Sequence, residues 1–403
     1  MQTKPQIGFG DWYCPKNLKN YLNEIIGSRR LTYGPFCEKL EKLFGEHNGT
    51  TLNNFCSSGT TALFTAIGTL KNIYADRAAK RKKIILPATT FISDFNCVKL
   101  NGFEPIFVDT TADYNMSLDG LEDCLKDNSA DIFAVMPSSL FGRPINGKKV
   151  KELIDAYSPQ AFFILDNCET ISAKYDGTYP ESHADFTAWS FYISHLLVGG
   201  ACGGMLGTNN TKYSIQARSY INHGRQPEYI SIDDDDNLES AKLKDITAKR
   251  FKFVQPGLNF RLGEVEAAFV LAMLEDDFAG QLKKREENAL KIYKALSKFN
   301  LKLPTINQNE QNRWMMFPIN VQAGNKWDLI NHLEKNGIET RELLPLYQKT
   351  TESHFTDIDK FRNNFPESAR AYDSGFYIGC HQYLQDADID YIEAVFEKYF
   401  SNN

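Results

Sequence analysis

The chain of 403 residues is 42% hydrophobic and 24% charged, with a formal net charge of −6. This composition is typical of a soluble globular protein that is long enough to form two domains. The acidic balance offers no basic surface for nucleic acid or for an anionic membrane, so we expect neither partner. The first residues lack the basic and apolar regions of a secretory signal, no apolar segment reaches about 18 residues, and the cysteines form no C-x-x-C pair. We therefore expect a cytoplasmic protein with reduced thiols.

Short apolar runs, rich in β-branched and aromatic residues, alternate with amphipathic segments in the first two thirds of the chain. The runs span residues 82–91, 102–110, 131–139, 160–168 and 185–192, and helical patterns occupy 118–127 and 148–157. Strands that alternate with helices predict an α/β fold with a mostly parallel central sheet and helices on both faces. Ligands of such sheets bind beyond the carboxyl ends of the strands, so the residues that follow each strand are the candidates for chemistry.

The pattern changes towards the C-terminus. Helical periodicity over 263–299 predicts one or two helices, which are followed by a candidate strand at 315–321 and an amphipathic final helix at 386–400. We predict a large domain of residues 1–265 with an N-terminal arm. Residues 266–403 would form a connecting helix and a smaller α+β domain.

Four residues near the predicted strand ends suggest a cofactor site. Gly59 lies in SSGTTAL at the start of a predicted helix, where free backbone N–H groups can hold a phosphate, although such a turn also serves as an ordinary helix cap. Asp166 follows a buried strand and could hold a pyridinium N–H or simply cap a turn. Ser190 is a second candidate phosphate donor, and Phe91 is either a lid on a flat ring or a core residue. Each signal is weak separately.

His195 stands five residues after Ser190, and the motifs around it follow one another in a familiar order. SSGTTAL, PATTFISD, LDNCE, SFYISH and GLNFRLGEVEAA together resemble the nucleotide-sugar aminotransferases, which are aspartate aminotransferase-like enzymes of fold type I that carry pyridoxal phosphate (PLP). In that family a lysine that binds the cofactor covalently occupies the position of His195. A smaller branch, the 4-keto-6-deoxysugar 3-dehydratases, has histidine there, and the segments 166–169, 223–224, 251–261 and 376–382 are similar to that branch.

The resemblance implies a reaction. Without the lysine, the amine form of the cofactor, pyridoxamine phosphate (PMP), would be the working species. His195, whose ordinary pKa lies near physiological pH, would remove a proton so that the C3 hydroxyl of the sugar is expelled. The implied substrate is a nucleotide-linked 4-keto-6-deoxyhexose such as GDP-4-keto-6-deoxymannose, with ammonia released and L-glutamate regenerating PMP.

The same resemblance implies roles for the cofactor-site residues. Gly59 and Thr60 would bind the phosphate through their backbone N–H groups, and Ser190 would add its hydroxyl. Phe91 would stack on the ring, where the GDP-sugar branch has tryptophan. Asp166 would pair with the pyridine nitrogen.

Further residues are implied at the edges of the site. Glu169 would lie near the phenolic oxygen of the ring. Asn259 matches an asparagine that reaches the cofactor phosphate of the neighbouring subunit, so a homodimer with shared active sites is part of the prediction. His223 and His381 are candidates for the substrate pocket or ordinary structural histidines, and Arg341 matches an arginine of the family without an assigned role.

The sequence also departs from the family pattern. The usual Gly-Glu-Gly-Gly after the catalytic position is GACG at 200–203, and a second histidine of the GDP-sugar branch is replaced by Leu196. The CDP-sugar branch carries an iron–sulfur cluster held by cysteines, but residues 223–251 contain none, so we expect no cluster. The acidic run at 233–236 indicates a solvated loop rather than a metal site, and we expect no metal.

Three functions stay open from the sequence. The first is the 3-dehydratase. The second is a nucleotide-sugar 4-aminotransferase in which another amine replaces the lysine, although Lys174 is the nearest candidate and residues 175–211 contain no lysine. The third is a catalytically silent homologue that binds a nucleotide sugar.

Overall fold

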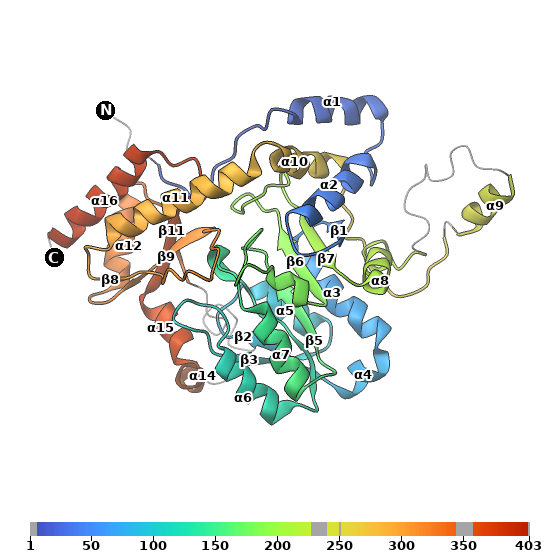
Figure 1. The fold of residues 1–403 in the computed structure, drawn as a ribbon, viewed down its shortest axis with the longest axis horizontal. Coiled ribbons are helices and arrows are strands. Elements are labelled where there is room, and N and C mark those ends of the chain that lie inside the picture. The colour runs from blue at the N-terminus through green and yellow to red at the C-terminus, as the bar shows by residue number, and fades with distance from the viewer. Residues whose placement is uncertain (1–5, 227–239, 250, 344–357, 402–403) are drawn as a thin grey trace.

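A seven-stranded sheet forms the centre of the larger part of the molecule (Figure 1). The computed structural model describes residues 6–226, 240–249, 251–343 and 358–401. The strand order is β1-β7-β6-β5-β4-β2-β3, and β7 is antiparallel to both of its neighbours while β2 to β6 pair in parallel. The strands are β1 (Leu52–Cys56), β2 (Lys83–Pro87), β3 (Glu104–Val108), β4 (Ile132–Val135), β5 (Phe162–Asp166), β6 (Phe186–Ser190) and β7 (Gly204–Thr208).

The predicted α/β fold with a mostly parallel sheet is confirmed, and each of the five predicted apolar runs contains one strand. Strand β1 was not among the predicted runs, and neither was β7. Its sequence GMLGT begins with glycine and has no β-branched residue before its last position, so it lacks the usual strand signal. It forms because both of its edges are paired, with β1 on one side and β6 on the other.

Helices cover both faces of this sheet, because alternate residues of each strand point to opposite sides. On β2, Ile84 and Leu86 pack in the cluster that includes α3, α5 and α8, whereas Ile85 packs in the cluster that includes α6 and α7. Near β1, β6 and β7, helices α2 and α10 complete the second face. The helices are α2 (Pro35–Glu46), α3 (Gly59–Ile73), α5 (Ile92–Leu100), α6 (Leu118–Asn128), α7 (Gly147–Tyr157), α8 (Thr211–Ile221) and α10 (Glu264–Glu275).

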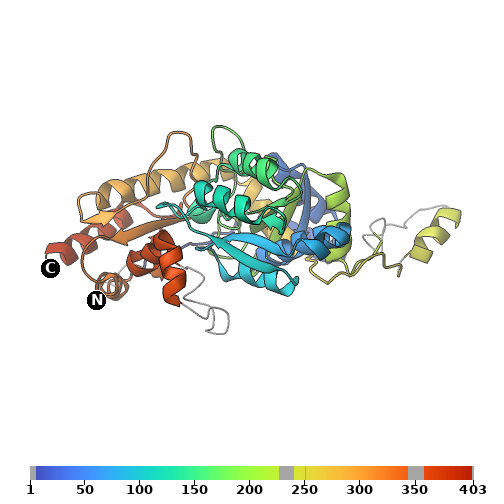
Figure 2. The same cartoon turned by 90° about the horizontal axis from the view of Figure 1, so that it is seen from below.

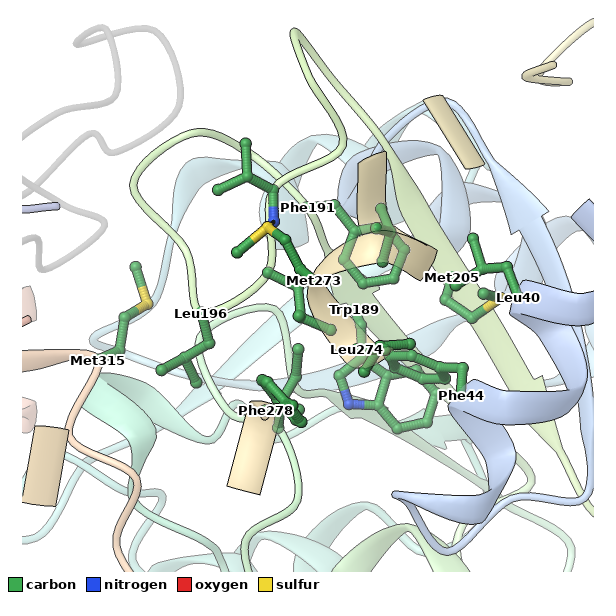
Figure 3. Close-up of a cluster of buried hydrophobic side chains, with 14 of the residues drawn as sticks. Leu40, Phe44, Trp189, Phe191, Leu196, Met205, Met273, Leu274, Phe278 and Met315 are labelled. Atoms are coloured by element: carbon green, nitrogen blue, oxygen red, sulfur yellow. Dashed lines mark hydrogen bonds between the residues drawn. The ribbon is translucent and has the colours of Figure 1, made fainter. Parts of the chain in front are cut away.

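The loop after β6, which carries His195, is anchored in the core. Phe191 and Leu196 from this loop pack with Trp189 of β6, Phe44 of α2 and Met273 of α10 (Figure 3). Leu196 is therefore a core residue in this chain. The anchoring fixes the position of the residues between Phe191 and Leu196.

The C-terminal part is built on a separate antiparallel sheet of order β10-β11-β9-β8, covered by helices (Figure 2). The predicted helical stretch at 263–299 is two helices, α10 and α11, which are separated at Asp276 and Asp277, and Asp277 caps α11 in a left-handed conformation. The elements are α11 (Phe278–Leu296), β8 (Leu301–Lys302), β9 (Met316–Val321), α12 (Lys326–Lys335), β10 (Thr340–Glu342), α14 (Ile358–Asn364), α15 (Pro366–Ser374), β11 (Gly375–Gly379) and α16 (Asp386–Ser401). A domain boundary at residue 265 stays a prediction.

The remaining elements lie outside these two sheets. They are α1 (Leu18–Ser28), α4 (Ala75–Lys80), α9 (Ser240–Lys249) and the short 3₁₀ turns Leu140–Gly142 and Pro180–His183. Helix α9 projects away from the body of the molecule (Figure 1). The acidic run at 233–236 falls outside the residues that the structure describes. In the part that is described, no helix is long and apolar enough to cross a membrane.

Candidate active site

The ends of three elements meet at Gly59. A Cβ added to this glycine would fall 2.3 Å from Sγ of Cys168, which follows β5, and 3.0 Å from Cβ of Ser190, which ends β6. Both distances are below normal contact, so the close approach requires glycine. The start of α3, the end of β5 and the end of β6 therefore lie together, as the sequence predicted for the carboxyl edge of the sheet.

The start of α3 is a capped helix whose first N–H groups could also hold an anion. Ser58 is the N-cap, and its side chain and that of Thr61 form a capping box. Gly59 and Thr60 are then the first two helical residues, whose N–H groups have no partner inside the helix. The two interpretations of this turn are compatible, because the cap uses Ser58 and Thr61 and leaves the N–H groups of Gly59 and Thr60 for an anion.

Asp166 is buried at the end of β5, with 6% of its surface exposed. Its Oδ1 accepts a hydrogen bond of 2.9 Å from the N–H of Cys168, and burial raises the pKa of its carboxyl group. Its main-chain carbonyl accepts from the N–H of Ser139 at 2.8 Å, which ties the end of β5 to the segment after β4. The hydrogen bond to Cys168 holds the carboxyl group of Asp166 in place, and the side chain of Cys168 in turn lies against Gly59.

His195 is held by its own loop. Its Nδ1 lies 3.2 Å from the main-chain oxygen of Ser190, and its main-chain N–H donates to the oxygen of Tyr192 at 2.8 Å. A carbonyl oxygen can only accept, so Nδ1 carries the proton and Nε2 has the free lone pair. Burial and, to a smaller extent, the charge of Arg285 lower the pKa of His195 to about 4, although the hydrogen bond to Ser190 opposes this shift. The ring is therefore a neutral base at neutral pH.

Arg285 of α11 is a buried cation beside two histidines. Its guanidinium donates to Oε1 of Gln382 at 2.7 and 3.1 Å and to the main-chain oxygen of Met315 at 2.8 Å, and within the described ranges it forms no ion pair. Burial and then the charge of Arg285 lower the pKa of His381 to about 4. Because Arg285 acts on both His195 and His381, these histidines belong to one region.

Glu169 joins the site to the C-terminal sheet. Its Oε2 accepts a hydrogen bond of 2.8 Å from the N–H of Phe141, a residue with a positive φ of 58°. Burial raises the pKa of Glu169 to about 7. The ring of Phe141 lies 5.4 Å from the ring of Tyr377 in β11, and burial and then the charge of Glu169 raise the pKa of that tyrosine. The left-handed Phe141 is the kind of local strain that concentrates at functional sites.

Phe91 is 53% exposed at the N-cap of α5. The interpretation of this residue as part of the core is therefore wrong, and its position suits a ring that covers a flat ligand. Thr60 and Ser93 connect the two neighbouring helix starts through a hydroxyl contact of 2.7 Å. No group of three His, Cys, Asp or Glu side chains that could hold a metal ion occurs in the described portions of the chain.

Residues 14–397 match the DegT/DnrJ/EryC1/StrS aminotransferase family. The chain belongs to this family. A GDP-perosamine synthase of Escherichia coli O157:H7 is 27% identical, over 83% of this chain and 85% of its own length. A GDP-4-keto-6-deoxy-D-mannose 3-dehydratase of Yersinia pseudotuberculosis is 23% identical, over 90% of this chain and 91% of its own. The structure of E. coli GDP-4-keto-6-deoxy-D-mannose-3-dehydratase with bound hydrated PLP has a TM-score of 0.82 at 20% identity, covering 98% of this chain and 100% of that one.

In this member of the family, the predicted residues Asn259 and His223 form a second group with Arg261. Nε of Arg261 donates to Oδ1 of Asn259 at 3.0 Å, and its Nη2 lies 3.5 Å from Nε2 of His223. Asn259 is exposed, and Phe253 and Leu258 nearby are exposed apolar residues. That Asn259 reaches the cofactor phosphate of a neighbouring subunit stays a prediction.

Arg341 lies on β10, at the edge of the site region. It forms a surface ion pair of 2.6 Å with Glu339, and its guanidinium lies 4.6 Å from the ring centre of Phe9. Its strand partner is Tyr377, the residue influenced by Glu169. Arg341 is thus connected to Glu169 through Tyr377 of the neighbouring strand β11 and through Phe141.

The unusual GACG turn keeps the backbone geometry that glycine permits. Gly200 and Gly203 have positive φ values of 75° and 154°, whereas Ala201 and Cys202 do not occur among the residues of positive φ. The two substitutions therefore fall where an ordinary side chain is tolerated.

Sequence reasoning missed Asp94 and Arg285. Asp94 is fully buried in the first turn of α5, and its Oδ2 accepts hydrogen bonds from the hydroxyls of Thr90 and Ser138; burial and then the charge of Asp166 raise the pKa of its carboxyl group. Asp94 is the last residue of the PATTFISD motif, which implied no role for it, and Arg285 lies in a helix without a motif. The only signal for Asp94 was an acidic residue close behind the β2 strand end, and Arg285 had none.

Proposed function

We propose that this chain is a PMP-dependent 3-dehydratase of a nucleotide-linked 4-keto-6-deoxyhexose. The observation that carries the proposal is His195 itself: a neutral imidazole with a free Nε2 stands where a cofactor-binding lysine would stand in an aminotransferase. The family includes relatives named for both reactions, so the histidine rather than the overall similarity favours dehydration.

The residues around Gly59 fit a pyridoxal-type cofactor. The N–H groups at the start of α3 and the hydroxyl of Ser190, which ends the neighbouring strand β6, suit the phosphate. The buried carboxyl group of Asp166 suits the pyridine nitrogen, and exposed Phe91 suits the face of the ring. When bound, PMP supplies the amine that reacts with the C4 ketone and a ring that accepts electrons.

His195 supplies the proton transfer. The hydrogen bond from Nδ1 to the oxygen of Ser190 fixes the tautomer, so Nε2 is the nitrogen that takes up a proton and can return it to the leaving C3 hydroxyl. Leu196 is buried in the core, so the neighbouring histidine of the GDP-sugar branch has no substitute at that position. In this chain a single imidazole would serve both transfers.

A 4-aminotransferase is the second candidate, and it needs an amine in the site. Nζ of Lys174 lies 4.6 Å from the ring centre of Tyr179, and its main-chain oxygen accepts from Gln311. This lysine is thus engaged with residues other than those around His195. We therefore rank the aminotransferase below the dehydratase, and the retained Gly59, Asp166 and Ser190 rank a silent homologue lower still.

The ratio of ammonia to 2-oxoglutarate formed in the reaction tests the proposal. Purified protein is incubated with PMP, L-glutamate and GDP-4-keto-6-deoxymannose, and ammonia and 2-oxoglutarate are measured. The dehydratase releases one ammonia for each 2-oxoglutarate, because the sugar loses oxygen and gains no nitrogen. An aminotransferase forms 2-oxoglutarate without ammonia, which would contradict the proposal.

Two variants sharpen this experiment. His195→Asn should lower the rate of ammonia release by about 10²–10⁴-fold. His332→Asn is the matched control, because Nε2 of His332 makes a similar contact of 3.0 Å with the main-chain oxygen of Val395 in the C-terminal part. That control should leave ammonia release unchanged.

A further inference from the structure

Two strained main-chain segments meet beside Glu169. Phe141, in the loop after β4, and Trp314, ahead of β9, adopt left-handed conformations with φ values of 58° and 49°. Such conformations are unfavourable for residues with a side chain, so the surrounding contacts must hold them. We call the contact between residues 141–142 and 313–315 the crossing.

Main-chain hydrogen bonds and close packing fix the crossing. The N–H of Met315 donates to the oxygen of Phe141 at 3.0 Å. The N–H of Arg313 donates to the oxygen of Gly142 at 2.8 Å. A Cβ added to Gly142 would fall 2.4 Å from the nitrogen of Trp314, and the φ of 82° at this position also favours glycine. The two segments therefore cannot shift independently.

One end of the crossing is held by Arg285 of α11, which is 3% exposed. Its Nη1 donates to the main-chain oxygens of Met315 at 2.8 Å and of Trp314 at 3.3 Å. Its Nε and Nη2 both donate to Oε1 of Gln382, at 3.1 and 2.7 Å. A planar guanidinium that donates from two of its edges is fixed in one orientation. Arg285 therefore anchors the crossing to α11 and to the segment after β11.

The other end of the crossing holds Glu169. The N–H of Phe141 donates to Oε2 of Glu169 at 2.8 Å. The ring of Phe141 lies 5.4 Å from the rings of both Tyr114 and Tyr377, which keeps this donor in place. A hydrogen bond from a main-chain N–H favours the ionised form of a carboxyl group, so this bond lowers the pKa of Glu169 against the larger effect of burial.

We propose that Arg285 is a positioning residue, which acts through the crossing to fix the carboxyl group of Glu169 in the active site. In the described part of the chain the two side chains share no direct hydrogen bond or ion pair, so the main chain between them carries the effect. The consequence for catalysis rests on the proposed function, in which Glu169 lies near the phenolic oxygen of the cofactor ring.

The titration of Glu169 in the cofactor-free protein tests the proposal. The infrared difference between each protein and the same protein with Glu169→Gln isolates this carboxyl group, whose pKa is about 7 in wild type. Arg285→Lys keeps the positive charge but loses the planar fork, so the Phe141 donor should move and the pKa of Glu169 should rise by about one unit. Equal pKa values of Glu169 in wild type and Arg285→Lys would overturn the proposal.

A second variant disturbs the crossing without changing any charge. Gly142→Ala places a Cβ against Trp314 and should also raise the pKa of Glu169 by about one unit. Gly102→Ala is the matched control, because Gly102 has a similar φ of 81° and an added Cβ would lie 3.8 Å from the nearest atom elsewhere in the chain. This control should leave the pKa of Glu169 unchanged.

The double variant Arg285→Lys/Gly142→Ala tests whether the two sites act along one route. Because Arg285 acts through the crossing, the double variant should shift the pKa of Glu169 no further than either single variant. Additive shifts would show that Arg285 acts independently of the crossing and would overturn the proposal.

The other titratable groups around Glu169 are the same in all of these proteins. Those that interact with Glu169 are Asp166 and Cys168 on its own segment and Tyr377 of β11. Ammonia release measured in parallel tests the proposed function separately. A wild-type protein that releases no ammonia would refute the dehydratase, while the infrared titration would still decide the role of Arg285.

Discussion

At the scale of single residues, the chemistry depends on a histidine whose environment keeps it neutral. Its ring is fixed through Nδ1 by the main chain of Ser190, and burial and the charge of Arg285 both disfavour the imidazolium form. A base with a low pKa is unprotonated at neutral pH but transfers protons with less driving force than one near 7. The site therefore keeps His195 unprotonated at neutral pH, and in return His195 is a weaker base than a histidine of ordinary pKa.

His195→Asn tests this residue in catalysis. Asparagine preserves most of the volume and can still donate to the oxygen of Ser190, but it has no basic nitrogen. We expect the rate of ammonia release to fall by about 10²–10⁴-fold, with PMP affinity unchanged in a fluorescence titration. A loss of PMP binding equal to the loss of rate would show that His195 holds the cofactor instead.

The pH dependence of stability has opposite signs at His195 and Glu169. Burial lowers the pKa of His195 from 6.5 to about 4, so the unfolded chain binds more protons there between these values, and the free energy of unfolding falls as pH is lowered through this window. Burial raises the pKa of Glu169 from 4.5 to about 7, so its contribution to stability is lost as pH rises through that window.

Denaturant unfolding at several pH values measures both effects. Relative to wild type, His195→Asn should lose about 1–2 kcal/mol less stability when pH falls from 6.5 to about 4. Glu169→Gln should lose about 1–2 kcal/mol less than wild type when pH rises from 4.5 to about 7. Parallel pH profiles for wild type and both variants would contradict these protonation states.

At the scale of elements, the site exists because α3, β5 and β6 end at the same place. Gly59 is the contact point, with Cys168 and Ser190 too close for any side chain there. The geometry of this junction sets the space between the N–H groups of α3 and the carboxyl group of Asp166. A side chain at Gly59 would have to push these ends apart.

Gly59→Ala should therefore destabilise the fold by about 1–3 kcal/mol and weaken PMP binding. Gly27→Ala is a matched control, because Gly27 lies in α1 with nothing within 4 Å of an added Cβ, and it should be neutral or stabilising by about 0.5–1 kcal/mol. Chemical denaturation and PMP titration give both quantities. Equal stability of the two alanine variants would refute the crowding at Gly59.

The sequence predicted elements where one local signal was strong. The β-branched run around Ile84 and Ile85 predicted β2, and Gly59 and Ser190, which were predicted to serve one phosphate, do lie together. It could not predict β7, whose pairing on both edges is a tertiary effect. It left open whether 263–299 forms one helix or two, because a left-handed aspartate that caps the next helix, Asp277, does not interrupt apolar periodicity.

The sequence predicted only those residues of the candidate site to which a motif assigned a role. Asp94 and Arg285 act through burial and through neighbours that are distant in sequence, and neither property is visible from local spacing. The grouping of Asn259 and His223 likewise depends on how Arg261 packs against them. The roles of such residues can be inferred only from the folded structure.

At the scale of the whole molecule, the exposed segment around Asn259 bears on assembly. Phe253 and Leu258 expose apolar surface beside Asn259, which suits a contact with a second copy of the chain. We predict a homodimer in which Asn259 of each subunit reaches the cofactor phosphate of the other. Both active sites would then be incomplete in a monomer.

Subunit complementation tests this arrangement. His195→Asn and Asn259→Ala should each be inactive alone, but a mixture allowed to exchange subunits should regain about a quarter of wild-type activity, because half of the dimers are hybrid and each hybrid has one intact site. Sedimentation measures the dimer in parallel. Activity of the mixture equal to the mean of the two separate variants would show that each site is built within one chain.

The product mass tests the central claim most directly. Wild-type protein is incubated with PMP, L-glutamate and GDP-4-keto-6-deoxymannose, and the sugar nucleotide is analysed by mass spectrometry. The proposed function predicts a product that has lost one oxygen atom and kept its ketone. A product in which an amine replaces the ketone would contradict the role of His195 and identify the chain as an aminotransferase.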